Sequence, residues 1–343
     1  MKIVVPEYYD EFKCLADKCS DNCCIGWEID IDSDTVERYE SLSPEDKKEI
    51  FETIDMSDTP RFLLDETERC MNLDCRGLCK IISKRGEGYL CNICRDHPRY
   101  FNRTPVGLEG GIGLACEAAA RLILTSEKPS EAKVIEYYEV TSRYTCDEMM
   151  ALRAREYALK YIDGMDMRGE AAEIAANRLM KFADALDEAI FDSAFAENNS
   201  GAAFTALLIA DLDEKISPET IAVMLDAFRD IEALTADFPE KLSSASKTVS
   251  DSRFYAFLNG EGRKYFSNLL CYYIHRYFLS DEASYLQNMG FAVISSLLIC
   301  AMAYERGDFS LDNFIDVAKK YSKNVEYSEE NVESVIENMA QLC

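Results

Sequence analysis

The sequence predicts a mainly α-helical protein in two parts, and the cysteines mark the change between them. Ten of the 14 cysteines lie in the first 116 residues, where glycine and proline interrupt short elements. Beyond Pro129, apolar residues recur at helical spacing almost to the end of the chain. We therefore predict an irregular, cysteine-rich α+β metal-binding domain over residues 1–130, packed on an all-helical domain over residues 131–343.

The first part contains three local signals of regular structure. Trp27, Ile29 and Ile31 alternate with acidic residues, which is typical of a half-buried strand. Residues 43–46 (SPED) place a capping serine before a proline and two acidic residues, which predicts the start of a helix. Residues 115–122 (ACEAAARL) predict a further helix that carries a cysteine at its start.

The second part shows a succession of helix patterns. Residues 179–190 place an apolar stripe on one helix face, and Ser217 with the following proline opens another helix. Residues 240–252 are polar and predict a helix end that runs into a loop. Residues 266–278 (FSNLLCYYIHRYF) predict a central, aromatic-rich helix. Two serines are predicted to cap the last helices, Ser310 and Ser328.

Charge and hydropathy restrict the possible partners. With 63 acidic and 37 basic residues the formal net charge is −26, which argues against nucleic acid and favours cationic partners such as lysine-bearing proteins. The most apolar stretch, residues 291–304, is shorter than the roughly 20 residues of a membrane span, so we expect no transmembrane segment. Residues 1–10 lack the basic and apolar regions of a signal peptide, and we expect a reducing cytoplasm.

The cysteine spacing predicts metal ligation. Thiolate is the ligand that zinc and iron–sulfur clusters select, and ten cysteines suffice for two sites. A disulfide framework is the competing interpretation, but 343 residues build a core without such bridges. The adjacent pair Cys23-Cys24 and the pair Cys91 and Cys94 also suit ligation from turns. The remaining four cysteines, Cys271 and Cys300 among them, are expected to behave as small apolar residues.

Only two histidines are present, which nearly excludes histidine-based metal sites and most catalytic triads. His275 lies within the aromatic helix, and we expect it to be a hydrogen-bonded core residue.

The cysteine segments, taken together, carry a family resemblance. They resemble the flagellin lysine-N-methylase family, whose members have a cysteine-rich N-terminal region followed by a helical one. Two C-terminal segments resemble the same family, while the middle of the chain (about 140 to 250) matches in character only. The matching segments are residues 12–27 (FKCLADKCSDNCCIGW), 70–79, 91–99, 114–122, 265–278 and 321–331 (YSKNVEYSEEN).

The resemblance implies methylation of lysine side chains on flagellin, or on another lysine-bearing protein, with S-adenosylmethionine as methyl donor. It also implies a 4Fe–4S cluster, one or two in number, that is structural or takes part in the transfer. Cys75 and Cys91 fall outside the family pattern. The cysteines that fit it as metal ligands are Cys14, Cys19, Cys23, Cys24, Cys70, Cys79, Cys94 and Cys116.

Methyl transfer requires a lysine amine that has lost its proton, although the unperturbed pKa of lysine is about 10.4. The matching segments offer proton acceptors for the amine and aromatic side chains that could form the walls of such a site. We expect Arg99 to bind the carboxylate of the donor through two hydrogen bonds. The candidate catalytic residues are Glu326, Tyr321 and Tyr327, the last at a position where the family often has histidine. The candidate donor-binding residues are Arg99, Tyr100, Trp27 and Glu117.

A second hypothesis is a non-catalytic metal-chelating or electron-transfer module. No glycine-rich S-adenosylmethionine loop is present in the sequence, which favours this alternative. Donor binding would distinguish the enzyme from the module.

Overall fold

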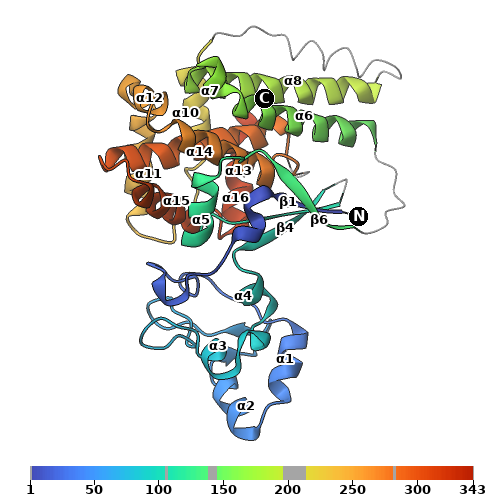
Figure 1. Cartoon of the computed structure of the whole chain (residues 1–343), viewed down its shortest axis with the longest axis vertical. Coiled ribbons are helices and arrows are strands. Elements are labelled where there is room, and N and C mark those ends of the chain that lie inside the picture. The colour runs from blue at the N-terminus through green and yellow to red at the C-terminus, as the bar shows by residue number, and fades with distance from the viewer. Residues whose placement is uncertain (1, 105–106, 138–144, 196–213, 281–282, 343) are drawn as a thin grey trace.

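The computed structural model describes residues 2–104, 107–137, 145–195, 214–280 and 283–342, and most of these residues are helical. The mainly α-helical fold is therefore confirmed. Figure 1 shows a body of packed helices and a small sheet, with a less regular lobe on one side. We refer to residues 13–98 as the cysteine-rich lobe and to the remainder as the helical body.

A four-stranded sheet joins the first and middle parts of the chain. It contains β1 (Lys2–Pro6), β4 (Arg99–Thr104), β5 (Gly107–Ile112) and β6 (Ala132–Tyr137), in the order β4-β5-β1-β6. The β1–β5 pair is parallel, and the β4–β5 and β1–β6 pairs are antiparallel. The prediction that everything beyond residue 130 is helical was wrong for β6, because pairing with the distant β1 stabilises this strand. The domain division at residue 130 stays a prediction.

The lobe consists of short elements connected by turns. Ser43 caps α2 as predicted, with its hydroxyl accepting from the Asp46 N–H. The elements are α1 (Ser33–Glu40), α2 (Pro44–Phe51), β2 (Ile54–Asp55), β3 (Arg61–Phe62), α3 (Lys80–Arg85) and α4 (Asn92–Asp96), with 3-10 turns at Glu7–Glu11, Ala16–Lys18 and Glu87–Tyr89.

The strand predicted around Trp27 to Ile31 does not form. Isolated bridges, Ile25 to Arg69 and Asp30 to Arg61, are the pairings of this segment among the described residues. Ile29 and Ile31 are nevertheless buried, so the alternation of apolar and acidic residues predicted correctly which side chains are buried. The segment lacks a continuous partner strand, because β3 opposite it is only two residues long.

The helical body contains the long elements. Ser217, Ser310 and Ser328 cap their helices as predicted. The helices are α5 (Glu117–Thr125), α6 (Cys146–Asp163), α7 (Met165–Arg168), α8 (Ala172–Phe195), α10 (Pro218–Asp226), α11 (Phe238–Thr248), α12 (Ser252–Leu258), α13 (Arg263–Tyr277), α14 (Tyr285–Glu305), α15 (Leu311–Val325) and α16 (Glu329–Asn338), with a 3-10 turn at Met339–Leu342.

The helix end predicted within residues 240–252 is confirmed, although the helix occupies most of the segment and the loop before α12 is short. Helix α11 continues to Thr248 and packs on α14. Phe238, Ala245 and Val249 are buried at helical spacing within this otherwise polar segment. The apolar face therefore decides the conformation, and the polar residues form the solvent face.

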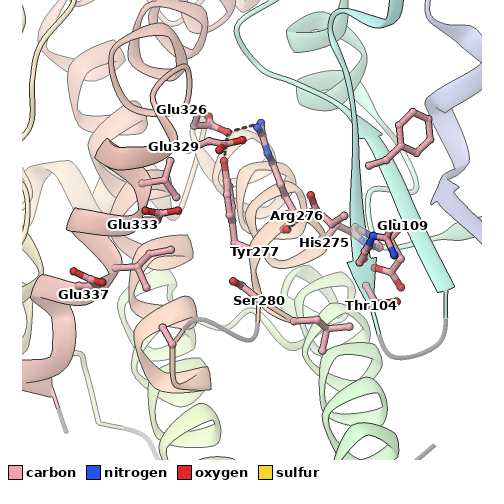
Figure 2. A pocket seen from close by; sticks show the side chains of 17 residues that line it. Thr104, Glu109, His275, Arg276, Tyr277, Ser280, Glu326, Glu329, Glu333 and Glu337 are labelled. Carbon is pink, nitrogen blue, oxygen red and sulfur yellow. Dashed lines mark hydrogen bonds and ion pairs between the residues drawn. The ribbon is translucent and has the colours of Figure 1, made fainter. Parts of the chain in front are cut away.

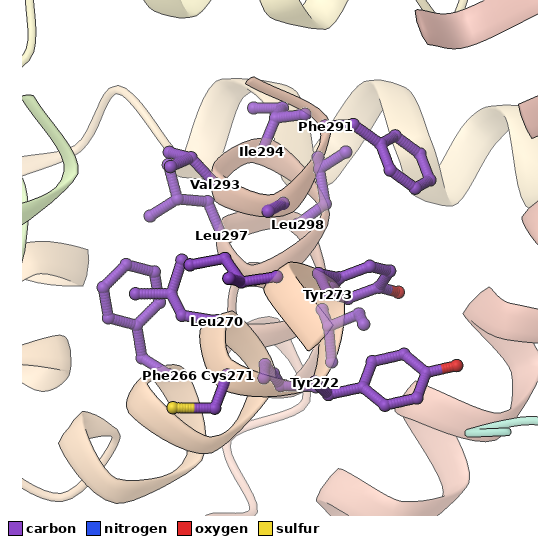
Figure 3. Packing of buried hydrophobic residues seen from close by; sticks show 14 of the residues in the cluster. Phe266, Leu270, Cys271, Tyr272, Tyr273, Phe291, Val293, Ile294, Leu297 and Leu298 are labelled. Carbon is purple, nitrogen blue, oxygen red and sulfur yellow. The ribbon is translucent and has the colours of Figure 1, made fainter. Parts of the chain in front are cut away.

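Helices α13 and α14 form the centre of the body (Figure 3). Phe266 and Leu270 of α13 pack with Val293 and Leu297 of α14, and all four are fully buried. Among the described residues α14 is the one helix long and apolar enough to cross a membrane, but 94% of its apolar window is buried inside the protein. That burial is typical of a core helix.

The scattered cysteines follow the prediction in part. Cys271 and Cys300 are buried in the core, as expected for small apolar residues. Cys146 begins α6 and is exposed, because the first turn of that helix faces solvent. Cys343 lies outside the described residues.

Candidate functional site

Five thiols gather in the small hydrophobic cluster of the lobe. Cys70 and Cys91 belong to that cluster, and Cys24, Cys79 and Cys94 pack against it. Four of the five were predicted as ligands, whereas Cys91 was left out. All described cysteines are free thiols. The lobe therefore collects sulfur atoms where a helical core would have aliphatic side chains.

Turns and helix starts position these thiols. Cys79 is the residue before α3 and Cys91 the residue before α4. The Cys70 N–H donates to the Cys24 carbonyl at 2.9 Å, which ties two distant segments together. Cys94 lies within α4, Cys24 in a turn and Cys70 in an isolated bridge, so the set comes together without any long helix or strand.

Hydrogen bonds between thiols shift their acidity. Cys23 and Cys24 have Sγ atoms 3.9 Å apart, and the hydrogen bond with Cys24 lowers the pKa of Cys23 to about 7. The hydrogen bond with Cys94 likewise lowers the pKa of Cys91. The pKa values of Cys24 and Cys94 are raised by these same bonds and by burial. Each pair thus holds one thiol that ionises readily, and thiolate is the form that binds metal.

A second set of thiols lies where the lobe meets α5. The Cys19 thiol donates to Glu117 Oε2 at 3.6 Å, and the Ser20 N–H donates to the same oxygen at 2.7 Å. Burial raises the pKa of Cys116 to about 11, with added contributions from charge on Cys19 and Cys23. Glu117, predicted to bind the donor, is instead occupied by the Cys19–Ser20 segment in this structure.

The remaining N-terminal cysteines lie apart from these two sets. Cys14 and Cys75 are exposed, and Cys14 Sγ accepts a hydrogen bond from the Ala16 N–H at 3.4 Å. Among the described residues, no three cysteine, histidine, aspartate or glutamate side chains converge closely enough to hold a single metal ion.

Three aromatic rings meet between the lobe and the helical body. The ring centroids of Trp27 and Tyr327 are 5.3 Å apart, and His97 lies 5.8 Å from Trp27 and 6.3 Å from Tyr327. The His97 Nε2 and the Tyr327 hydroxyl are buried, and neither has a hydrogen-bond partner among the described residues. We call these three residues the aromatic triad. Its two unpartnered polar atoms indicate a place where a ligand can bind.

Burial also sets the protonation of the aromatic triad. It lowers the pKa of His97 to about 4, and the positive charge of Lys323 contributes to the shift. Burial, followed by charge on Cys23, raises the pKa of Tyr327 well above 10. At neutral pH the triad therefore contains a neutral imidazole and a neutral phenol.

Two lysines of α15 fasten the lobe beside the aromatic triad. Lys323 Nζ lies 2.9 Å from Asp21 Oδ2 and donates to the Asn22 carbonyl at 3.1 Å. Lys319 Nζ lies 3.4 Å from the same Asp21 oxygen. Burial opposes ionisation of Asp21, but the hydrogen bond and charge of Lys323 outweigh it, so the pKa of Asp21 is lowered. These ion pairs fix the Cys19–Trp27 segment against α15.

Glu326 lies at the other side of the same turn between α15 and α16. Its carboxylate accepts from the Tyr272 hydroxyl at 2.7 Å, from Tyr273 at 3.1 Å and from Tyr277 at 3.0 Å. Arg276 Nη1 donates to it at 2.7 Å. The Glu326 side chain has no exposed surface. Oε2 accepts three of these hydrogen bonds and Oε1 accepts one, so four donors engage this carboxylate.

Tyr100 supports Arg276 from the sheet. The Arg276 guanidinium lies 4.4 Å from the centre of the Tyr100 ring, and Asn102 Nδ2 donates to the Arg276 carbonyl at 2.6 Å. A Cβ at Gly111 would collide with the Tyr100 side chain, so glycine is required for the ring to lie across β5. Tyr100, predicted as a wall of the donor site, thus holds the Arg276–Glu326 pair.

A cavity of about 580 Å³ lies beside this pair (Figure 2). It is bounded by β4, by the end of α13 and by α16, and Arg276 and Glu326 line it together. His275 also lines it, and burial lowers the pKa of His275 to about 3, with a contribution from the charge of Arg155. His275 is a buried histidine with backbone hydrogen bonds to Pro129 and Ser130, as predicted, while its Nε2 has no partner among the described residues.

Two predicted residues lie away from the cavity and the aromatic triad. Tyr321 is fully buried, and its hydroxyl forms a hydrogen bond with Ser295 Oγ at 3.0 Å. The Arg99 guanidinium lies over the rings of Phe12 and Tyr9, at 5.0 and 5.6 Å from their centres. Both side chains therefore have local roles in this structure.

Several residues of the site were not among the predicted ones. Cys91 was signalled by its spacing from Cys94, but the family pattern excluded it. His97 follows that pair directly and had no signal of its own. Arg276 lies inside the aromatic helix, where one cation among apolar residues indicates a buried partner.

Comparison with known proteins identifies the family of this chain. A family model for the FliB lysine N-methylase C-terminal domain matches residues 161–342, more than half of the chain. The lysine-N-methylases of Salmonella typhimurium and Salmonella choleraesuis are each 21% identical to it, over 96% of this chain and 92% of theirs. The flagellar biosynthetic protein FliU of Salmonella muenchen is 24% identical over 41% of this chain and 90% of its own length. No solved structure matches. The chain belongs to the FliB lysine N-methylase family.

Proposed function

We propose that this protein methylates lysine side chains of a protein substrate, with S-adenosylmethionine as donor. The observation that carries the proposal is the match to proteins named lysine-N-methylase along 96% of the chain. The site supports it in two ways: the aromatic triad has two buried, unpartnered polar atoms, and an acidic cavity lies on the other side of the same turn.

We propose the aromatic triad as the donor site. S-adenosylmethionine supplies an electrophilic methyl group on a positively charged sulfonium. Trp27 and Tyr327 present ring faces, which attract such a cation, and the His97 Nε2 and Tyr327 hydroxyl offer hydrogen bonds inside a buried site. Two of these three residues were predicted from the sequence, one from each end of the chain.

The reacting amine must be neutral, and the surroundings of the triad favour that state. Burial penalises a lysine cation relative to the neutral amine. Tyr327 keeps its proton at neutral pH, so its hydroxyl can orient the amine but does not serve as the base. We assign Glu326 a positioning role, because Arg276 and three tyrosines already donate to its carboxylate.

We further propose that the five gathered thiols hold an iron–sulfur cluster. The donor chemistry fits, since these are free thiols in an apolar cluster and two thiols of the lobe have lowered pKa values. Each thiolate of a 4Fe–4S cluster binds a separate iron, so such a cluster does not need three side chains to converge on one metal ion. Cys19, Cys23 and Cys116 would supply three ligands of a second cluster.

The substrate is proposed from the name of one relative, and the compartment from the thiols. A relative named for flagellar biosynthesis supports flagellin as the methylated protein. Free thiols that bind iron require a reducing environment, so we propose that the protein acts in the cytoplasm.

The test uses anaerobically purified protein. Iron and sulfide analysis together with absorbance near 400 nm report the cluster, and calorimetry reports binding of S-adenosylmethionine. Incubation with labelled donor and flagellin from the same genome, followed by mass spectrometry, should show methylated surface lysines. The metal-chelating or electron-transfer module would replace this proposal if cluster-loaded protein binds no donor and methylates no lysine-rich protein.

A further inference from the structure

Strand β4 forms one end of the sheet, and the cavity follows its outer edge. Phe101, Asn102, Arg103 and Thr104 are consecutive residues of β4, and all four line the cavity. Alternate side chains of a strand point to opposite faces, so a hollow over one face would touch every second residue. Contact with four residues in a row indicates that the cavity runs along the backbone edge.

The backbone register leaves that edge open. The Gly113 N–H donates to the Pro98 carbonyl, which makes this a hydrogen-bonded antiparallel pair. The register then makes Tyr100 and Asn102 hydrogen-bonded residues as well. The N–H and C=O groups of Arg99, Phe101 and Arg103 therefore point away from β5. Within the described chain no backbone hydrogen bond from outside the sheet reaches them.

A row of carboxylates faces this edge from α16. Glu329, Glu333 and Glu337 follow each other at four-residue spacing, line the cavity and are exposed (Figure 2). No hydrogen bond or ion pair from the described residues engages these three carboxylates. Glu109 binds Arg155 and Glu326 binds Arg276, while Arg103 of β4 adds one positive charge to the wall, fewer than the three carboxylates opposite it. We call Glu329, Glu333 and Glu337 the acidic row. Its charge is complementary to a cationic ligand.

Apolar side chains also line the cavity. Phe101 is a large hydrophobic side chain with 45% of its surface exposed, and Leu279, Val332 and Ile336 contribute to the lining. An open strand edge, an apolar floor and a charged rim together are the features of a site that binds an extended peptide by adding a strand.

We infer that an extended segment of a lysine-bearing protein pairs with the outer edge of β4 and directs basic side chains at the acidic row. The dimensions agree: four residues of an α-helix rise about 6 Å, and two residues of a strand rise about 6.6 Å. Lysines at alternate positions of the segment would therefore meet successive glutamates. The inference deepens the proposed function, because β4 begins directly after His97 and Pro98 and so leads toward the aromatic triad.

Peptide chemistry tests the pairing directly. The probe is a nine-residue acetylated peptide in which lysine alternates with valine, labelled for fluorescence anisotropy and added to the full chain without methyl donor. We expect binding that weakens with salt, and no binding when glutamate replaces lysine. Two further peptides carry N-methyl groups on alternate backbone amides, one on the odd-numbered and the other on the even-numbered residues. The peptide whose methyl groups point away from β4 should bind as the parent does, and the peptide whose methyl groups replace the N–H groups that face β4 should not bind. Equal binding of both N-methylated peptides and the parent would overturn the inference.

Matched protein variants test each half of the site. Arg103→Pro removes an outward N–H and should weaken binding about fivefold relative to Arg103→Ala, which removes only the side chain. Neutralising the acidic row (E329Q/E333Q/E337Q) should weaken binding about tenfold at low salt. The triple variant E37Q/E45Q/E240Q changes the net charge equally at exposed sites outside the cavity, and it should bind as the wild type does. Equal loss in both triple variants would show only a net-charge effect and would contradict the site.

Failure of this inference can be separated from failure of the proposed function. If the peptides bind as expected but no lysine is methylated, the docking edge stands and the enzymatic activity fails. If flagellin is methylated at equal rates by wild type, Arg103→Pro and the E329Q/E333Q/E337Q variant, the activity stands and the docking edge fails.

Discussion

The helical body and the cysteine-rich lobe differ in the residue types that form their cores. In the body, α13 and α14 bury continuous apolar surface, and serine caps and packed aromatic rings define the helix ends and contacts. The buried cluster of the lobe has only ten residues, two of them cysteines, with three further thiols packed against it. So small a core supplies little hydrophobic stabilisation. The comparison indicates that the body folds by apolar burial, whereas the lobe depends on what its thiols bind.

Both regions also contribute residues to the proposed donor site. The lobe contributes Trp27 and His97 to the aromatic triad, and the body contributes Tyr327. The ion pairs of Lys319 and Lys323 with Asp21 hold these contributions together. The site is therefore complete only when both regions are folded.

The largest expected effect separates the two cores. Cys94→Ser should remove most of the iron and unfold the lobe, because metal binding and folding are coupled in a domain with so small a core. Iron content, together with limited proteolysis between residues 13 and 98, measures both consequences. Cys300→Ala is the matched control, since Cys300 is buried in the helical core. It should lower the melting temperature and leave the iron unchanged, and equal iron loss in both variants would contradict the assignment.

The next effect concerns the polar centre of the body. Glu326→Ala leaves Arg276 without its carboxylate partner and three tyrosine hydroxyls without an acceptor. We expect a loss of about 3–5 kcal/mol in the free energy of unfolding, measured by chemical denaturation. Glu329→Ala, at an exposed position of the same cavity, should change it by less than about 0.5 kcal/mol. Similar values for both variants would show that the Glu326 network adds little.

A pH effect should come from His275. Its folded pKa of about 3 lies below the unfolded value of about 6.5, so between these values the unfolded chain binds a proton that the folded protein does not. His275 therefore makes stability fall as pH decreases from about 6.5 toward 3, by about 1.4 kcal/mol per pH unit. Unfolding midpoints measured from pH 7 to 4 should have a shallower slope in His275→Gln, while His97 still contributes its own part. An unchanged slope would contradict the buried, neutral state.

The smallest stability effect distinguishes two tyrosines near the same turn. Tyr321→Phe removes a hydrogen bond to Ser295 and should cost about 1 kcal/mol of stability without changing the methylation rate. Tyr327→Phe removes a buried hydroxyl that has no partner among the described residues, so stability should stay equal or rise. Its methylation rate should fall, because that hydroxyl is proposed to contact the donor or the amine. Unchanged methylation by Tyr327→Phe would remove this residue from the proposed site.

Much of the helical body could be predicted from the sequence, because its signals are local. Ser217, Ser310 and Ser328 cap helices within three residues of their own position. The apolar periodicity of residues 179–190 and 266–278 likewise depends only on neighbours along one helix. The same reasoning failed for β6, since a short strand is stabilised by its partner β1 and not by its own pattern.

The sequence by itself determined the helical character, the acidic charge and the wealth of thiols, all of which are properties of composition and short-range order. Only the tertiary structure decided that Cys91 joins the gathered thiols, that Trp27 meets Tyr327, and that Glu326 is enclosed by Arg276 and three tyrosines. These contacts join segments far apart along the chain. Side-chain contacts of that range depend on how helices and turns pack in space, and no local pattern of residues encodes that packing.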